Sequence, residues 1–431
     1  MTPLTKTTHK PTFSKYEIFI ITLLAILQFS VILDFMVLSP LGYILLPILN
    51  IQPSQFGLVV SAYAFSAGAS GLLAAGFADR YDRKKMLLFF YLGFIIGTAL
   101  CAIAPSYNLL LAARIVTGLF GGVIGSISSA IITDLFTMQV RGRVMGFVQT
   151  AFAASQILGL PIGIILAQQF SWHSPFWMIS GISIIIWVVI YRYLKPITEH
   201  LKIKSERNPF EHLYKTISQP TYLRGFLATT LLATGGFMMM PFGSVFSTHN
   251  LKIAKENLPL LFGITGVFSI IFGPLIGKWS DKIGKFKTFT IGSFISITMV
   301  AIFTNLGPTP LTLVIFLNVI LFVGISSRMI SSSALLTAIP KPQDRGAFMS
   351  INAAVQQISG GIAASVAGMI VVQSKTGELQ NYPRLGLVVI GSMVITMVLM
   401  YNLNKQIAIN NTFTSDQTKS SEADMEAKAI I

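Results

Sequence analysis

Three ionisable side chains lie inside long apolar stretches of the sequence, namely Asp34, Arg114 and Arg328. A charge at membrane depth costs on the order of 3 kcal/mol, so such residues usually face a cavity and take part in function. Burial favours the neutral form of an acid, whereas a nearby arginine favours the carboxylate. An acid held between these influences can exchange a proton when its surroundings change, which makes Asp34 a candidate proton carrier. Arg328 is a candidate contact for an anionic substrate; the alternative is that its charge extends toward an end of its helix.

Uncharged polar side chains recur at helical spacing in two other apolar stretches. Gln149 and Gln156 are seven residues apart, and Asn352 and Gln356 are four apart, so each pair lies on one face of a helix. We expect these faces to line a cavity. A run of three methionines that begins at Met238 offers soft, adaptable contacts, and with the amides it would suit a moderately amphipathic small molecule. The alternative for the methionines is lipid contact or ordinary packing.

The composition shows which elements must position these side chains. Of 431 residues, 53% are hydrophobic and only 11% are charged, whereas soluble domains carry about 25% charged residues. The apolar runs approach the roughly 20 residues that a helix needs to cross a bilayer and far exceed the roughly ten-residue strands of membrane barrels. We therefore predict an all-α polytopic membrane protein with twelve spans, at about 17–40, 54–76, 85–105, 108–133, 143–168, 174–194, 221–246, 258–279, 287–306, 310–337, 346–373 and 383–403.

The net charge is +15, and the basic residues responsible for it are predicted to lie mostly on one side of the membrane. Of the 31 Lys and Arg residues, about 25 fall in the termini and the even-numbered connections, and the other side holds Lys252, Lys255, Lys375 and Arg384. Basic residues near short loops stay cytoplasmic, so both termini are predicted to be cytoplasmic, in a plasma (inner) membrane. The basic charge is then a topology signal, and we expect no nucleic-acid partner. The single cysteine, Cys101, provides no metal or redox framework, so no cofactor is predicted.

The sequence repeats itself after about 200 residues. A shift of 202 places Asp79 on Asp281, and a shift of 204 places residues 140–146 (VRGRVMG) on 344–350 (DRGAFMS). Such repeats are typical of transporters built from two similar bundles. We predict two pseudo-symmetric six-helix bundles, residues 17–194 and 221–404, joined by a cytoplasmic linker, residues 195–220. A cytoplasmic N-terminal segment, residues 1–16, precedes them, and a disordered cytoplasmic tail, residues 405–431, follows.

A strip of small residues repeats every four positions in the fifth span, and the same shift maps it onto the eleventh. Small residues at this spacing allow helices to approach closely in lipid. We expect the two strips to form smooth surfaces on which the bundles rock against each other; the alternative is tight packing without motion. The strips are Ser155, Gly159, Gly163 and Ala167, and Ser359, Ala363, Ala367 and Val371.

Several motifs resemble those of the major facilitator superfamily, over nearly the whole chain. The connections GFADRYDRKK (76–85) and GKWSDKIGKFK (277–287) are similar to the family's loop between helices two and three, and RIVTGLFGG (114–122) to its fourth helix. The fifth span, with LGLPIG (158–163), looks like the twelve-helix drug:proton antiporter and sugar-efflux branch. The resemblance implies that helices one and four line the cavity. Arg114 would then neighbour Asp34 and tune a coupling proton; the alternative is a permanent structural ion pair.

The resemblance also implies a cytoplasmic gate. In the family the loop Asp, here Asp79, meets the start of helix eleven, and the loop Arg, here Arg83, pairs with an acid ending helix four, here Asp134. A carboxylate at a helix N-terminus gains about 0.3–1 kcal/mol from the dipole, enough to bias an equilibrium and weak enough to break in each cycle. The alternative role is to fix topology. The predicted gating set is Asp79, Arg80, Arg83, Asp134 and Arg141, with Asp281, Lys285 and Arg345 in the second half.

These features favour a proton-coupled secondary transporter that exports a small organic molecule by alternating access. The alternatives are an importer of the same fold and a membrane sensor without flux. The sequence has no Walker A motif for ATP, and no His, Cys and Glu cluster or Ser–His arrangement that would indicate an enzyme. The expected partners are a small-molecule substrate, protons and the lipid bilayer, and the family usually works as a monomer.

Overall fold

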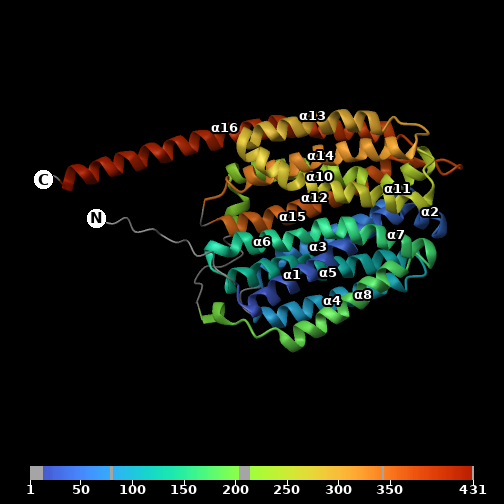
Figure 1. The fold of residues 1–431 in the computed structure, drawn as a ribbon, viewed down its shortest axis with the longest axis horizontal. Helices are drawn as coiled ribbons and strands as arrows, with labels where there is room; N and C mark the ends of the chain where they lie inside the picture. Colours follow the sequence, from blue (N-terminus) through green and yellow to red (C-terminus); the bar gives the residue numbers. More distant parts are fainter. Residues whose placement is uncertain (1–12, 78–80, 203–213, 342–343, 430–431) are drawn as a thin grey trace.

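The computed structural model describes residues 13–77, 81–202, 214–341 and 344–429 (Figure 1). Within these residues, twelve helical spans are long and apolar enough to cross a membrane, which confirms the predicted all-α polytopic fold. The spans, numbered here one to twelve in chain order, agree with the predicted ranges to within a few residues. The exception is span one, which continues to Ile48.

The first bundle comprises spans one to six. Spans one and five each consist of two α-helices, joined by a 3₁₀ segment in span one and by a π-helical segment in span five. The elements are α1 (Lys15–Val37), η1 (Ser39–Leu41), α2 (Gly42–Ile48), α3 (Pro53–Phe77), α4 (Arg83–Ala102), α5 (Tyr107–Leu135), α6 (Met138–Ala154), η3 (Ser155–Gly159), α7 (Leu160–Gln169) and α8 (Ser174–Tyr193). A short helix, η4 (Glu199–Lys202), follows in the linker.

The second bundle comprises spans seven to twelve and ends in a long helix. Its elements are α10 (Pro220–Met239), η5 (Met240–Phe242), α11 (Gly243–Val245), η6 (Phe246–Asn250), η7 (Lys255–Asn257), α12 (Leu258–Ile283), α13 (Lys285–Phe303), α14 (Leu311–Leu336), α15 (Arg345–Ile370), the antiparallel pair β1 (Val372–Gln373) and β2 (Leu379–Gln380), and α16 (Tyr382–Ala429).

Spans one and seven break at equivalent places. Pro40 and Gly42 interrupt span one, and Pro241 and Gly243 interrupt span seven. Proline has no backbone N–H and clashes with the preceding turn, so the chain passes through a short 3₁₀ segment at each position. The two breaks lie 201 residues apart, close to the 202 to 204 residues that separate the other repeated motifs.

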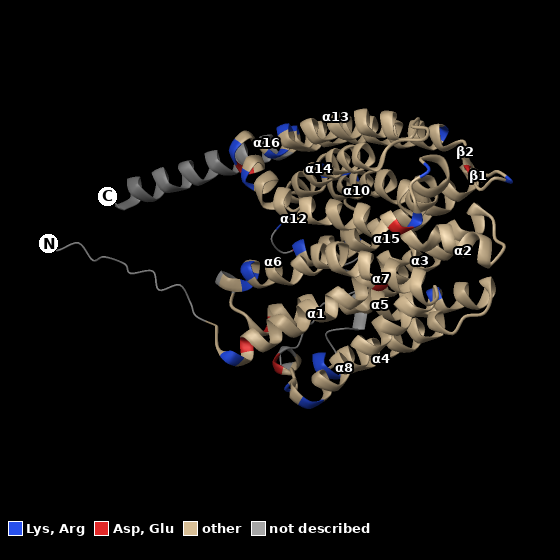
Figure 2. Cartoon of the chain, turned by 45° about the vertical axis from the view of Figure 1, so that its right-hand side comes forward, with Lys and Arg blue, Asp and Glu red and all other residues tan. Residues whose placement is uncertain are grey.

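The two bundles lie side by side, as the lower blue-to-green and upper yellow-to-red halves of Figure 1 show. They meet where α3 packs on α15 and where α12 packs on η3 and α7. The first contact joins spans two and eleven, and the second joins spans eight and five. Because the repeat makes span eight the counterpart of span two and span eleven the counterpart of span five, the two contacts are equivalent and the arrangement is pseudo-symmetric. The first and last described residues, Phe13 and Ala429, lie at one end of the molecule, which we call the terminal end (Figure 1). Lys and Arg concentrate there and are sparse at the opposite, distal end (Figure 2).

The strips of small residues pack inside the bundles, which corrects their predicted place between them. An added Cβ on Gly159 would lie 2.5 Å from Leu33, and one on Gly163 would lie 2.7 Å from Val37, both in span one. In the second bundle, Ser359 Oγ donates to Thr230 Oγ1 of α10 at 3.0 Å. Spans five and eleven thus use their small residues to approach the first helix of their own bundle. Spacing alone shows that a close neighbour exists and does not identify it.

The last helix continues past the predicted end of span twelve. α16 extends to Ala429, so residues 405–429 are helical instead of forming the disordered tail that their polar composition predicts (Figure 1). The sequence contains neither Gly nor Pro after Gly391, so it lacks the residue types that most often end a helix. Residues 203–213 of the predicted linker lie outside the described residues.

Candidate functional site

A cavity of about 510 Å³ lies mainly within the second bundle. Its walls come from α10, α12, α13, α14, α15 and α16, and among the described lining residues the first bundle contributes Gln149 of α6. Most of the lining is apolar, with phenylalanines and methionines such as Phe237 and Met329. Polar groups interrupt it at the charged Arg328 and at several amides and hydroxyls, including Asn318, Ser332 and Tyr382.

Of the six residues predicted to line a substrate cavity, four line the cavity described here: Gln149, Arg328, Asn352 and Gln356. Met238 instead belongs to the packed core, with 1% of its surface exposed, and its neighbours Met239 and Met240 line the cavity. Gln156 lies half-buried in the π-helical segment η3 and is not part of this lining.

Arg328 occupies the cavity wall almost without solvent contact. The residue is 4% exposed, and its guanidinium lies 5.6 Å from the centroid of the Phe289 ring. Its Nη1 atom is buried and has no hydrogen-bond partner. Nearby on α15, Asn352 accepts a hydrogen bond from Thr229 through Oδ1 at 2.5 Å, which leaves its NH₂ group as the free polar end.

Asp34 and Arg114 form a buried ion pair inside the first bundle. Arg114 Nη1 lies 2.8 Å from Asp34 Oδ2, and neither side chain is exposed. Thr98 donates to Asp34 Oδ1 at 3.1 Å, and the guanidinium lies 4.5 Å from the centroid of the Tyr63 ring. The Nε and Nη2 atoms of Arg114 have no hydrogen-bond partner. The two predicted neighbours are thus together, but neither lines the cavity.

The first-half gating residues are placed only in part. Asp79 and Arg80 lie outside the described residues. Arg83 Nε donates to Asp134 Oδ2 at 3.0 Å, with 5% and 15% of the two side chains exposed. Both residues belong to the first bundle, so this ion pair joins the start of α4 to the end of α5. Arg141 donates from Nε to the Phe136 carbonyl oxygen at 2.8 Å, and so caps the last turn of α5.

The second-half copies are arranged differently. Lys285 pairs with Asp281 four residues earlier, at an exposed site, and Arg345 is exposed at the first turn of α15. Sequence reasoning missed Asp344, which precedes α15. Its Oδ2 accepts a hydrogen bond from the Tyr222 hydroxyl at 2.8 Å, and the Tyr222 hydroxyl oxygen in turn accepts one from the Lys341 backbone N–H at 3.1 Å.

Asp82 was also missed as a structural residue. Its Oδ1 accepts from the backbone N–H groups of Lys84 (2.9 Å) and Ile197 (3.0 Å), so it caps α4 and holds the start of the linker. A serine, aspartate or asparagine one residue before a helix is a readable capping signal. Its second partner is a distant backbone group, which no motif reveals.

The bundles are joined at the distal end by reciprocal hydrogen bonds at the two proline breaks. Ser39 Oγ donates to the Met240 carbonyl oxygen at 2.6 Å, and Ser244 Oγ donates to the Ser39 carbonyl oxygen at 3.3 Å. Gln168 adds a bridge from Nε2 to the Lys255 carbonyl oxygen at 2.6 Å. The repeated pattern of a proline followed two residues later by glycine is visible in the sequence and indicates the two breaks, but not the hydrogen bonds between them.

Spans five and eight separate toward the terminal end. An added Cβ on Gly266 would lie 2.8 Å from Ile157, whereas one on Gly273, two turns further along the same face of α12, would meet no atom within 4 Å. The same is true of Gly277 and of Gly146 on the facing span. The bundles therefore meet at the distal half and are apart at the terminal half of this helix pair.

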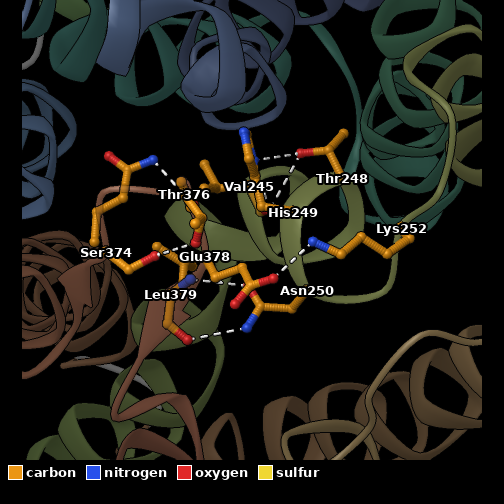
Figure 3. A network of polar contacts seen from close by, with 11 residues as sticks. Val245, Thr248, His249, Asn250, Lys252, Ser374, Thr376, Glu378 and Leu379 are labelled. Carbon is orange, nitrogen blue, oxygen red and sulfur yellow. Dashed lines mark hydrogen bonds and ion pairs between the residues drawn. The ribbon is translucent and has the colours of Figure 1, made fainter.

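A polar network fixes the distal end of span seven to the hairpin of β1 and β2 (Figure 3). Asn250 donates from Nδ2 to the Leu379 carbonyl oxygen (3.0 Å) and accepts from its N–H (2.9 Å), and Lys252 Nζ lies 2.6 Å from Glu378 Oε1. Gly377 has a φ of +87°, and an added Cβ there would lie 2.5 Å from His249. All of these residues belong to the second bundle, so the network stabilises that bundle rather than joining the two.

The sequence is similar to those of several proteins of known name. An uncharacterized MFS-type transporter, YceJ of Bacillus subtilis, is 31% identical over 60% of this chain and 66% of its own length. Multidrug resistance protein 3 of the same species is 35% identical over 35% of this chain and 29% of its own length. A probable sugar efflux transporter of Helicobacter pylori is 24% identical over 65% of this chain and 70% of its own. The chain thus matches just under two thirds of the first relative and under one third of the second.

Solved structures share the fold. A bacterial homologue of the human lysosomal transporter Spinster superposes with a TM-score of 0.70 at 15% identity, over 93% of this chain and 98% of that one. The nucleoside transporter NupG gives 0.72 at 15% identity, over 89% and 99%. The sequence profile of the Major Facilitator Superfamily matches residues 24–364 and 225–407, which together span most of the chain. The chain therefore belongs to the Major Facilitator Superfamily and is a membrane transporter rather than an enzyme.

Proposed function

We propose that this transporter exports a small organic molecule in exchange for protons by alternating access. The observation that carries the proposal is the fully buried Asp34–Arg114 pair. Two buried guanidinium nitrogens of Arg114 lack hydrogen-bond partners, so the carboxylate compensates only part of that group. Protonation of Asp34 would remove this compensation and would force the surrounding helices to rearrange, because an unpaired buried charge costs several kcal/mol.

A route for this rearrangement leads to the cavity through span one. Asp34 lies five residues before Ser39, whose hydroxyl bonds to the carbonyl oxygen of Met240, and Met240 lines the cavity. A shift of α1 on protonation would therefore act on the distal contact between the bundles and on the cavity wall together. We propose that this linkage couples the proton to the substrate.

The conformation described here corresponds to one of the two states of an alternating-access cycle, closed at one end of the molecule and open at the other. The bundles are joined at the distal end and separate at the terminal end between spans five and eight. If both termini are cytoplasmic, as the distribution of basic residues predicts, the state is inward-facing. Efflux is favoured over import by the names of two relatives, a multidrug resistance protein and a probable sugar efflux transporter.

The test is transport in proteoliposomes with an imposed pH gradient, a pH-sensitive dye inside and a panel of drugs, sugars and metabolites. Antiport predicts proton movement opposite to the substrate, and symport, the mechanism of an importer, predicts movement in the same direction. Asp34→Asn should lose gradient-driven transport and retain exchange of substrate between the two sides at equal pH. Retained exchange also shows that the variant is folded. Full gradient-driven accumulation by Asp34→Asn would refute the coupling role.

A further inference from the structure

The cavity wall contains a cation without an anionic partner. Arg328 is 4% exposed, lines the cavity, and carries a buried Nη1 atom without a hydrogen bond. Its aromatic neighbour Phe289 offers the face of a ring, which stabilises a cation weakly compared with a carboxylate. No lining residue among the described ones is an Asp or a Glu.

Among the described residues, the second bundle supplies no counter-ion at membrane depth either. The acids of residues 220–405 are Glu256, Asp281, Asp344 and Glu378, all of which lie in or beside connections between spans. In the first bundle, Asp34 is paired with Arg114. The two membrane-embedded arginines thus differ: one has a carboxylate built into the protein, and the other faces a cavity of about 510 Å³ without one. Buried charges are normally paired.

We propose that the transported molecule is an amphipathic organic anion, whose single anionic group, a carboxylate or a group of similar charge, binds to Arg328. The inference rests on the proposed function in taking this cavity as the substrate site. One unpaired cation calls for one negative charge. A cationic substrate would be repelled by Arg328 at short range in a water-poor site.

The remaining lining residues indicate the chemistry of the uncharged part of the proposed substrate. The free NH₂ end of Asn352 and the amide of Gln356 provide neutral polar groups, and the buried Tyr382 hydroxyl also lacks a partner. The larger part of the wall is apolar, from Phe237, Phe262, Phe322, Met239, Met240 and Met329. An inorganic anion would not fill the cavity and would not contact this apolar surface. An organic molecule with one negative charge and few polar groups would do both.

The experiment measures binding of matched probes to the purified full chain in lipid nanodiscs. Each set has one apolar body, phenylbutyl, naphthylmethyl or octyl, that carries a carboxylate, the corresponding primary amide or an amine. We expect the carboxylate of at least one set to bind about ten-fold or more tightly than its amide, and the amine to bind least, because a charge-assisted hydrogen bond to a buried group is worth that factor.

Variants assign the preference to Arg328. Arg328→Gln should weaken carboxylate binding about ten-fold or more and leave amide binding within about two-fold, and Arg328→Lys should keep part of the preference. The matched control is Arg224→Gln, which removes the same charge from an exposed position on α10 outside the cavity. Should Arg328→Gln fail to fold, the comparison of Arg328→Lys with the wild type across acid, amide and amine serves the same purpose.

Four results would overturn the proposal: no carboxylate binds, acid and amide bind equally, the amine binds best, or Arg328→Gln weakens acid and amide alike. Proton-driven transport of a neutral or cationic compound that Arg328→Gln leaves unchanged would also overturn it, while the proposed function would stand. Conversely, Arg328-dependent anion binding without any proton-coupled flux would support the anion site and refute the proposed function.

Discussion

At the scale of single residues, the decisive contrast is between ion pairs that differ in burial. The Asp34–Arg114 pair has no exposed surface, so removing one partner would leave an uncompensated charge at a cost of about 3–5 kcal/mol. The Arg83–Asp134 pair is buried only in part, and Lys285–Asp281 lies at the surface. Contacts of intermediate strength suit a bundle that must change conformation repeatedly, because they bias an equilibrium without preventing it.

We predict that Arg83 and Asp134 act as one unit. Arg83→Gln and Asp134→Asn should each lower the transport rate, and the double variant should be little worse than either, since each single change already breaks the same contact. The expected coupling energy in a double-mutant cycle of transport rates is about 0.5–3 kcal/mol. Transport assays on the four proteins at equal amounts in proteoliposomes measure it.

Lys285→Gln is the control, because Lys285 is the repeat counterpart of Arg83 and its own ion pair, with Asp281, is exposed. We expect little change in rate, as is usual for surface ion pairs. Strictly additive losses at Arg83 and Asp134, or an equal loss for Lys285→Gln, would contradict a special role for the first-half pair.

At the scale of helices, the sequence predicted which helices exist better than it predicted which way their side chains face. Twelve spans, two bundles and the Arg83–Asp134 and Asp34–Arg114 neighbours follow from apolar runs, a repeat and the family's motifs. Met238 was placed in the cavity, but its neighbours line it. Each residue turns a helix by about 100°, so Met238 and Met239, adjacent on α10, face different sides of the helix. Which helix a small residue faces, and which backbone N–H a carboxylate such as Asp82 accepts from, depend on tertiary packing.

The contact between spans two and eleven runs nearly the length of both helices and relies on glycine. An added Cβ on Gly57 would lie 2.7 Å from the Ala364 carbonyl oxygen, and one on Gly68 would lie 2.6 Å from Ile358. Ser61 Oγ donates to the Gly361 carbonyl oxygen at 2.7 Å between these points. This pair of helices stays in contact where spans five and eight separate. We therefore infer that the bundles rotate about this contact, which we call the fulcrum.

We therefore predict that Gly57→Ala impairs both stability and transport. The new methyl group would press on backbone, which cannot move aside as a flexible side chain can, and overpacking of this kind costs about 1–3 kcal/mol. Thermal unfolding followed by tryptophan fluorescence and transport in proteoliposomes measure the two effects.

Gly71→Ala is the control on the same helix, since its added Cβ would meet the nearest atom at an ordinary 3.5 Å. It should be neutral or slightly stabilising, because alanine favours a helix over glycine. A Gly57→Ala protein as stable and active as Gly71→Ala would show that the helices have room to separate there, and would remove this contact as the fulcrum.

At the scale of the whole molecule, the pseudo-symmetry determines how a single movement can open one end and close the other. The proline breaks of spans one and seven meet at the distal end, joined by Ser39 and Ser244, and Gln168 bridges to the backbone of Lys255. Rotation of the bundles about the contact of spans two and eleven would break these bonds and would bring spans five and eight together at the terminal end. In the proposed alternating-access cycle, the distal contacts would therefore open once per turnover.

This requirement predicts that a covalent link across the distal contact stops transport. Cysteines at Gln168 and Lys255, in a Cys101→Ala background, would be joined by a reducible thiol crosslinker. Transport should fall to the level set by the uncrosslinked fraction and return on reduction, since the link removes the distal-open state. The control places cysteines at Lys252 and Glu378, whose side chains are in contact within one bundle, so their crosslink should leave transport intact. Undiminished flux through the fully crosslinked Gln168–Lys255 protein would mean that the substrate passes without separation of the bundles at this end, and alternating access in the form argued here would be wrong.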